Sequence, residues 1–265
     1  MATKTAKKSA RKAPAAKPKA AKAVPAKVAA GPSNADLMKR LARAEHDIGI
    51  LQDKNAIKEL HYKYGYYIDK CMWVEAVDLF ADDCEVRFAN GVYKGKKGAH
   101  RLYVGWFQKL FTGGYNGPIY GFLLDHMMFQ FIIDVADDRK TAKARGRGFL
   151  LGGVHESKKD PIPGVPDEFV EGGVYENTYV NDKGIWKIKL LDYNVTFQAD
   201  FKKGWKHDSV HIPPLTKTYP EDPNGPDELK KEVPYSWPKT SVLPFHYPHP
   251  VTGKMWKGKT KGIGK

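Results

Sequence analysis

The sequence contains little cysteine and no long apolar run. Its two cysteines, Cys71 and Cys84, are too few for a disulfide framework and form no closely spaced metal-type pair, so a reducing compartment is expected. No run of about 18 apolar residues occurs, which predicts that no helix spans a membrane. The basic start is not followed by the apolar core or cleavage-site pattern of a secretory signal. We therefore expect a cytoplasmic protein.

Acidic residues are absent from residues 1–30. This stretch holds eight Lys and one Arg, which account for most of the formal net charge of +14. Residues 1–33 consist mainly of Ala, Lys and Pro and have little to bury, so we expect a disordered basic tail. Such a tail attracts polyanions loosely, but it has no interleaved aromatic residues on which bases could stack. Nucleic-acid binding beyond non-specific contacts of the tail is therefore not expected.

The order of helical and alternating patterns predicts the fold of residues 34–199. Apolar residues at three- and four-residue intervals predict helices first, with Ser33 or Asn34 as the N-cap of the first one. Period-two alternation then predicts a long antiparallel meander, and this order indicates an α+β domain with a cone-shaped curved antiparallel sheet packed against N-terminal helices. The predicted helices are Asp36–Gln52, one that ends near Asp69, Trp73–Phe80 and Lys97–Phe111; the predicted strands are Cys84–Ala89, Asp125–Val135, Thr141–Val154, Phe169–Val180 and Ile185–Phe197.

The last part of the chain, residues 200–265, is rich in proline. It carries scattered aromatic residues and has little periodicity. So long a segment without regular structure is not expected inside one compact domain unless it wraps another surface. We therefore predict a C-terminal arm that lies across the domain or across a neighbouring protomer.

Asp69 is the first candidate for acid/base chemistry. It interrupts the aromatic and apolar side of a predicted helix at its C-terminal end, with Tyr66 three residues earlier and Tyr64 close by. An unpaired buried carboxylate is costly, so a partner is expected elsewhere in the chain. The alternative is that Asp69 only caps the helix predicted to begin near Trp73.

His126 is the candidate partner. If its side of the strand lines the space between sheet and helices, the imidazole lies in a largely apolar cavity. Asp69 would then fix the imidazole tautomer and stabilise its cationic form, as a general base requires. The alternative is a core or rim histidine that is bonded to backbone groups. Alternation along the strand predicts that Met128, Gln130 and Ile132 share a face with His126. The opposite face would carry Asp125, Met127, Phe129 and Phe131.

Taken together, these segments resemble the SnoaL-like branch of the nuclear-transport-factor-two-like superfamily. The resemblance covers roughly residues 50–200 and rests on the order of IKELHYKYGYYIDK, LFADDCEV, YKGKKGA, DHMMFQF, GRGF, YENTYV and GIWKI. It implies that the helix-borne aspartate of the family is Asp69 and that its strand-borne histidine is His126. In dehydratase and dehydrochlorinase members, such a pair abstracts a proton and expels a leaving group without a metal or organic cofactor. The dehydratase has a tyrosine directly before its aspartate, whereas this chain has Ile68.

Within that branch, the pattern is most similar to the diarylpropane lyases of bacteria that degrade aromatic compounds. These enzymes release a hydroxymethyl carbon of a lignin-derived diol as formaldehyde and form a stilbene. The resemblance implies a cofactor-independent lyase that takes a small aromatic substrate, and a homo-oligomer, either a trimer or a dimer. The alternatives are a dehydratase or isomerase of another aromatic substrate, a non-catalytic binding module of the same fold, and the small subunit of a ring-hydroxylating oxygenase.

Tyr64, Tyr66, Arg145, Tyr175 and Asn177 are the candidate substrate-binding residues. Arg145 shares a strand face with Arg147 and could bind a phenolate, although solvated arginines would give the same pattern. Tyr175 and Asn177 could hydrogen-bond a substrate, although strand pairing explains them equally well. No metal site is expected, because the histidines that could suggest zinc lie in proline-rich sequence without a nearby cysteine; they are His207, His211, His246 and His249.

Overall fold

The computed structural model describes residues 31–208 and 212–258, and the chain divides into two units, residues 1–42 and 43–265. Nearly all of the predicted basic tail lies outside the described residues. In the first unit, helix α1 (Asn34–Asp69) begins. The Ser33 hydroxyl accepts a hydrogen bond from the Asp36 backbone N–H, and the Asp36 carboxylate accepts one from the Ser33 backbone N–H. This reciprocal capping confirms Ser33 as the N-cap.

The two helices predicted before Asp69 form one continuous helix, α1. No glycine or proline separates them, so nothing ends the first helix near Gln52. In the second unit, buried Asp53 anchors α1 to the sheet: its carboxylate accepts hydrogen bonds from Arg139 Nε at 2.5 Å and Trp186 Nε1 at 3.0 Å. Burial acts to raise the pKa of Asp53, but these two hydrogen bonds lower it below its usual value.

The remaining elements follow the predicted order. The predicted helix Lys97–Phe111 is present as a run of α3, a π-helical segment η1 and α4, and each predicted strand is present with slightly different ends. The helices are α2 (Trp73–Asp78), α3 (Gly95–His100), η1 (Arg101–Phe107), α4 (Gln108–Thr112) and α5 (Gly204–His207). The strands are β1 (Phe80–Phe88), β2 (Gly91–Lys94), β3 (Phe122–Val135), β4 (Thr141–Val154), β5 (Glu168–Asp182), β6 (Ile185–Asp200) and β7 (Glu228–Leu229).

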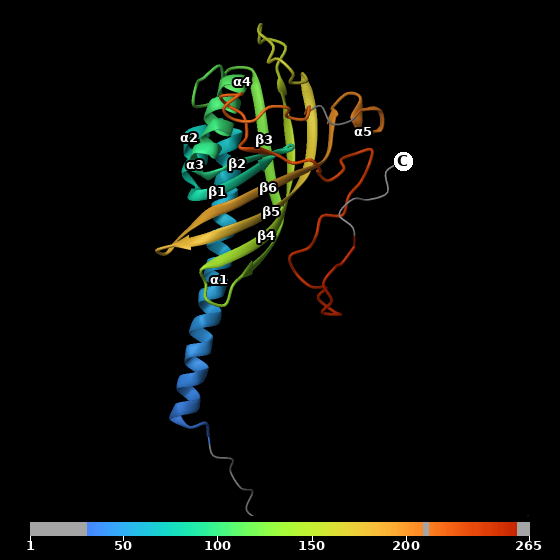
Figure 1. Cartoon of the computed structure of the whole chain (residues 1–265). Coiled ribbons are helices and arrows are strands. Elements are labelled where there is room, and N and C mark those ends of the chain that lie inside the picture. Colours follow the sequence, from blue (N-terminus) through green and yellow to red (C-terminus); the bar gives the residue numbers. More distant parts are fainter. Residues whose placement is uncertain (1–30, 209–211, 259–265) are drawn as a thin grey trace, which may run out of the picture. The chain divides into compact units, whose positions relative to one another are not determined.

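The strands form one curved sheet in the order β3-β4-β5-β6-β1-β2-β7. All neighbouring strands are antiparallel except β1 and β6, which are parallel. Helices α2, α3 and α4 lie on one side of the sheet, while α5 and much of the C-terminal segment lie on the other (Figure 1). The predicted α+β class, with N-terminal helices packed against a curved antiparallel-rich sheet, is confirmed.

A bulge in β3 changes which residues of that strand face the core. Gln130 has a φ of 57°, and the pairing of β3 with β4 shifts between Phe129 and Ile132. The extra residue reverses the alternation, so Phe131 packs 4.7 Å from buried His61 while Ile132 is 43% exposed. The prediction that Ile132 shares the strand face of His126, with Phe131 on the other face, was wrong for this reason. Gly146 leaves room for the Phe131 ring, since a Cβ there would lie 2.4 Å from it.

The C-terminal segment contacts the domain of its own chain. The Asn90 side chain and the backbone of Leu215 exchange two hydrogen bonds, and β7 pairs with β2. Asp227 accepts hydrogen bonds from the Arg101 guanidinium at 2.6 Å and from the Lys94 backbone N–H at 2.7 Å. These contacts fix residues 215–229 along the β2 edge. A contact with a neighbouring protomer stays a prediction.

Candidate active site

A cavity of about 320 Å³ lies between the helices and the inner face of the sheet. This volume is near the lower end of the roughly 300–1,000 Å³ that ligand sites enclose. One part of the wall is aromatic and comes from α2, η1 and α4; it consists of Trp73, Trp106, Phe107 and Phe111. Segments 163–166 and 212–213 also line the cavity. The cavity therefore suits a compact, largely apolar molecule.

Asp69 and His126 meet at the wall of this cavity. Asp69 Oδ1 accepts a hydrogen bond from the His126 backbone N–H at 2.5 Å and lies 3.0 Å from His126 Nδ1. Both side chains are nearly buried, with 10% and 12% of their surfaces exposed, and His126 lines the cavity. Because Nδ1 faces the carboxylate, the imidazole keeps Nε2 available as a proton acceptor. The predicted contact is present; its catalytic role stays a prediction.

The local sequence explains how the helix end reaches this strand. Asp69 is the last residue of α1, and Gly65 lies one turn earlier. A Cβ at Gly65 would lie 3.1 Å from Met128 Cγ and 3.6 Å from the His126 carbonyl oxygen, so the glycine allows the helix to approach β3 closely. The alternative role of Asp69 as a cap is wrong, because the N-cap of α2 is Met72 and α2 has no side-chain cap.

Tyrosine hydroxyls supply most of the remaining polar groups of the wall. Tyr64 and Tyr103 form a hydrogen bond of 2.7 Å between their hydroxyl oxygens, and the rings of Tyr175 and Tyr193 lie 4.5 Å apart. Burial raises the pKa of all four phenols, so they remain neutral hydrogen-bonding groups near pH 7. The predicted lining residues Tyr64 and Tyr175 thus face the cavity, whereas Tyr103 and Tyr193 were not predicted.

Glu171 is a second acidic residue of the cavity, and the sequence reasoning missed it. It is buried, and its carboxylate accepts hydrogen bonds from Tyr193 Oη at 2.7 Å and Gln198 Nε2 at 2.8 Å. Burial raises the pKa of Glu171 to about 7, against the lowering effect of these two hydrogen bonds. Alternation offered a signal: Glu171 is four residues before Tyr175 and therefore on the same strand face.

Three predicted substrate-binding residues lie elsewhere. Tyr66 is 72% exposed, because it lies on a different side of α1 from Tyr64. Arg145 pairs with Glu176, donates to the carbonyl oxygen of Leu243 at 3.0 Å and lies over the Phe245 ring, so it holds the C-terminal segment. The predictions that Tyr66 and Arg145 line the substrate site were wrong for these reasons.

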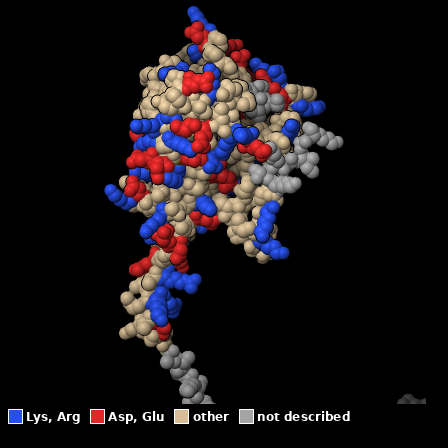
Figure 2. Space-filling model, viewed as in Figure 1, with Lys and Arg blue, Asp and Glu red and all other residues tan. Residues whose placement is uncertain are grey.

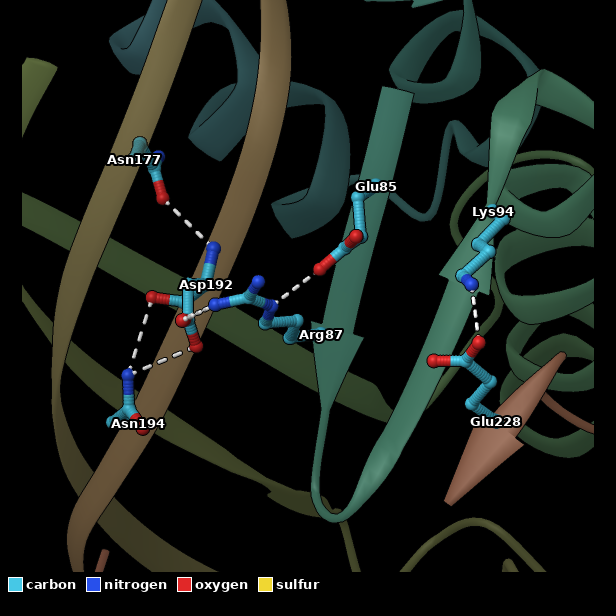
Figure 3. Close-up of polar contacts among 7 residues, drawn as sticks. All are labelled: Glu85, Arg87, Lys94, Asn177, Asp192, Asn194 and Glu228. Atoms are coloured by element: carbon cyan, nitrogen blue, oxygen red, sulfur yellow. Dashed lines mark hydrogen bonds and ion pairs between the residues drawn. The ribbon is translucent and has the colours of Figure 1, made fainter. Parts of the chain in front are cut away.

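Asn177, the third, is buried but does not line the cavity. Its amide nitrogen lies 3.3 Å from His61 Nδ1 and 3.2 Å from Tyr179 Oη. Its oxygen accepts a hydrogen bond from the Asp192 backbone N–H at 3.1 Å, which Figure 3 shows beside the ion pairs of β1 and β6. Asn177 therefore joins α1 to two strands and is not placed to touch a ligand.

Arg87 is the cationic residue of the cavity lining, and it is already paired. Its guanidinium donates to Glu85 at 2.5 Å and to Asp192 at 2.7 Å (Figure 3). Asn194 donates in turn to the Asp192 carboxylate at 3.1 Å. A guanidinium held by two carboxylates has little remaining attraction for an anion. This network therefore braces β1 against β6.

Three further features of the described residues concern surface charge, metal binding and membrane spans. In Figure 2, acidic and basic side chains are interspersed on the face in view. Within residues 31–208 and 212–258, no cluster of three or more His, Cys, Asp or Glu is arranged to hold a metal ion. One of the four histidines considered for zinc, His211, lies outside those ranges. None of the helices in the same ranges is both long enough and apolar enough to cross a membrane.

Comparison with solved structures gives similar folds at low identity. A Novosphingobium aromaticivorans protein assigned as a scytalone dehydratase has 22% identity and a TM-score of 0.46, over 60% of this chain and 91% of its own. The hexachlorocyclohexane dehydrochlorinase LinA-type3 of Novosphingobium barchaimii has 19% identity and a TM-score of 0.46, over 64% and 99%. For ActVI-ORFA of Streptomyces coelicolor the identity is 15% and the TM-score 0.42, over 54% and 93%.

At these identities, the similarity extends to the fold alone. Comparison with curated proteins gives no match. The family assignment rests instead on residues 50–192, more than half of the chain, which match the family described as the SnoaL-like domain. The matched range contains Asp69, His126 and Glu171. With its helices packed on a curved antiparallel-rich sheet, the chain belongs to the SnoaL-like domain family.

Proposed function

We propose that this chain is a cofactor-independent lyase in which Asp69 and His126 form the acid/base pair. The proposal rests on one observation: the 3.0 Å contact between Asp69 and His126 Nδ1 at the wall of an aromatic cavity. A carboxylate on one imidazole nitrogen orients the ring and stabilises the imidazolium that forms when the other nitrogen takes a proton. Asp69 is therefore a positioning residue, and His126 is the group that contacts the substrate.

The substrate we propose is a lignin-derived diaryl propane diol, which would yield a stilbene and formaldehyde. The aromatic wall would pack against its two rings, and the neutral tyrosine hydroxyls would bind its oxygen atoms. His126 would take the proton of the terminal hydroxyl as the carbon–carbon bond breaks.

The test is turnover of a synthetic diaryl propane diol by the purified chain. Ultraviolet absorption follows the stilbene, and a colorimetric assay follows formaldehyde. His126→Ala and Asp69→Asn are expected to lower kcat/KM by about 10²–10⁴-fold, the usual contribution of acid–base catalysis. His46→Ala is the matched control, because His46 is a partly exposed histidine whose Nε2 lies 2.9 Å from the Asp137 carbonyl oxygen, away from the cavity.

Two results would contradict the proposal. One is a wild type that converts neither this diol nor its simple benzylic alcohol analogues, although it binds them, which would indicate a binding module. The other is turnover that the two substitutions leave unchanged while circular dichroism shows that the variants fold. Loss of stilbene with retained loss of water would keep the acid/base pair but replace the lyase by a dehydratase.

A further inference from the structure

His126 and Glu171 lie in one row across the sheet. The strand pairing places His126 opposite Leu150, Leu150 opposite Glu171, and Glu171 opposite Gln198. All four residues line the cavity. Two strand spacings separate the Cα atoms of His126 and Glu171, roughly 10 Å. The side chains therefore approach the same space from two ends, with room for a carbon framework of a few atoms between them.

The surroundings of Glu171 differ from those of a structural carboxylate. Its partners are neutral: Tyr193 at 2.7 Å from Oε1 and Gln198 at 2.8 Å from Oε2. The Gln198 amide is a donor, so Oε2 acts as an acceptor, and a proton on Glu171 would lie on Oε1. The hydrogen bond with Tyr193 would then reverse, with Oε1–H donating to the Tyr193 hydroxyl oxygen. Structural carboxylates of the same sheet are instead paired with cations, as Glu176 is with Arg145 and Asp192 with Arg87. Without such a cation, burial favours the protonated acid.

Tyr193 and Glu171 both line the cavity, and two glycines make room for the Tyr193 ring beside the acid. A Cβ at Gly173 would lie 2.3 Å from the Tyr193 ring and 2.5 Å from its hydroxyl oxygen. A Cβ at Gly148 would lie 3.0 Å from the Tyr175 ring and 3.5 Å from that of Tyr193. Because the two glycines have no side chain, both tyrosine rings can pack directly against the backbone. This position lets the Tyr193 hydroxyl reach Glu171.

From this geometry we infer that Glu171 is the proton donor of the reaction and that it acts through the hydroxyl of Tyr193. The inference rests on the proposed function and deepens it, because it assigns the group that protonates the departing oxygen. It also defines the substrate class: an alcohol whose leaving hydroxyl and acidic hydrogen lie at opposite ends of a short carbon framework. His126 serves one end of that framework, and the Glu171–Tyr193 pair serves the other.

The proposed step balances without a co-reactant. His126 Nε2 takes the proton of the terminal hydroxyl, whose carbon leaves as formaldehyde when the carbon–carbon bond breaks. The electrons of that bond form the new double bond and expel the benzylic hydroxyl. This hydroxyl takes the Tyr193 proton and leaves as water, while the Glu171 proton moves to Tyr193. His126 is then protonated and Glu171 ionised, and one proton returns from His126 to Glu171 through solvent.

The test compares two leaving groups, a benzylic alcohol and its acetate ester. Protonation is essential for hydroxide to leave but has little effect on acetate. Glu171→Gln and Tyr193→Phe are therefore expected to lower turnover of the alcohol by about 10²-fold or more, and turnover of the ester by only a few-fold. His126→Ala should lower both. Glu168→Gln is the matched control, since Glu168 lies on the same strand with its side chain half exposed and near Lys202.

Two further measurements distinguish this inference from the proposed function. Turnover of the alcohol should fall as pH rises through about 7 in the wild type, and Glu171→Gln should remove that decline. Carbon-13 NMR of glutamate-labelled protein, assigned with Glu171→Gln, should show one carboxyl that titrates near 7. The other ionisable groups of the cavity lining are His126, Arg87 and the four tyrosines, so His126→Ala identifies the imidazole contribution.

The outcomes separate clearly. Equal losses on alcohol and ester for Glu171→Gln, or a labelled carboxyl that titrates near 4.5, would overturn the role of Glu171 while His126→Ala still supports the lyase. A wild type that converts no diol would overturn the proposed function. Selective loss on the alcohol, together with the removed pH decline, would establish the relay.

Discussion

Two histidines lie between α1 and the sheet, and their surroundings give them different properties. His126 lines the cavity with Nδ1 against the Asp69 carboxylate. His61 is fully buried against Phe131 and Tyr175, and it faces only neutral groups. Its Nδ1 lies 3.1 Å from the Tyr179 hydroxyl and 3.3 Å from the Asn177 amide, so Nδ1 is the acceptor and Nε2 carries the proton.

A carboxylate partner and access to a cavity therefore distinguish a histidine that can exchange protons from one that only packs. Burial lowers the pKa of His61 to about 3, so this imidazole stays neutral near pH 7. With no carboxylate beside it and no place in the cavity lining, it has no route for a proton. His126 has both features. Substitutions at the two histidines and at their neighbours test this distinction.

Exchanging each histidine for glutamine should separate turnover from packing. His126→Gln keeps a polar side chain but removes the proton acceptor, so we expect kcat/KM to fall by about 10²–10⁴-fold with little change in melting temperature. His61→Gln should lower the melting temperature instead and leave turnover of the folded protein unchanged. Steady-state kinetics and thermal unfolding of both variants test this, and equal kinetic losses would end the distinction.

The pH dependence of stability should report His61 directly. Its pKa is about 3 in the folded state against an ordinary value of 6.5, so the unfolded chain binds the extra proton. Stability is then complete above pH 6.5 and falls as pH decreases, by up to about 1.4 kcal/mol per unit between pH 6.5 and 4.5. Urea unfolding at several pH values measures this slope in the wild type and in His61→Leu.

The wild-type curve also contains an opposite contribution from Glu171. The folded pKa of Glu171 is about 7 against an ordinary value of 4.5, so its contribution is complete below pH 4.5 and is lost as pH rises through 7. The informative quantity is therefore the difference between the wild type and His61→Leu, in which the Glu171 effect cancels. A difference that does not vary with pH would show that His61 is not held neutral.

Gly146→Ala should disturb the packing around His61 without touching the cavity. The added Cβ would lie 2.4 Å from the Phe131 ring, which packs on His61, and an over-packed core typically costs about 1–3 kcal/mol. Urea unfolding measures the loss. Ala144→Gly provides the comparison, because Ala144 lies on the same strand as Gly146 and the substitution removes a Cβ where Gly146→Ala adds one. Gly164→Ala would not serve as a control, because Gly164 has a positive φ.

Tyr179→Phe is expected to give the smallest change. It removes the hydrogen bond to His61 Nδ1 and the one that the Tyr179 hydroxyl accepts from the Asn177 amide, but this amide still reaches His61 Nδ1 and offsets part of the loss. The loss of stability should be about 1 kcal/mol, the net value of a typical hydrogen bond. Combining Tyr179→Phe with His61→Leu in a double-mutant cycle tests the coupling, and additive effects would show that the two side chains do not interact.

Much of this arrangement could be predicted from local patterns. Helical spacing and period-two alternation located the main helices and strands, because burying one face of each element requires those periods. The pairing of Asp69 with a distant base followed from the cost of a buried charge. The bulge at Gln130 could not be predicted this way, since the residue has no glycine-like signature, and it moved Phe131 into the core. Tyr66 was misplaced because the helix turns it into solvent.

Long-range contacts decided the remaining features of the site. Arg145 is occupied by a segment almost a hundred residues later in the chain, and no local pattern shows that partner. Glu171 stands out only when its neighbours across the sheet are known, because strand register places it in line with His126.

Three features follow from the amino-acid sequence alone: the α+β order of elements, the basic character of residues 1–30 and the presence of an acid on a largely apolar helix face. Folding in three dimensions sets which imidazole meets that acid, which carboxyl has no cation beside it, and which tyrosines surround the cavity. The physical reason is that periodicity reports the face a residue occupies, whereas proton affinity depends on burial and on partners brought together by the sheet.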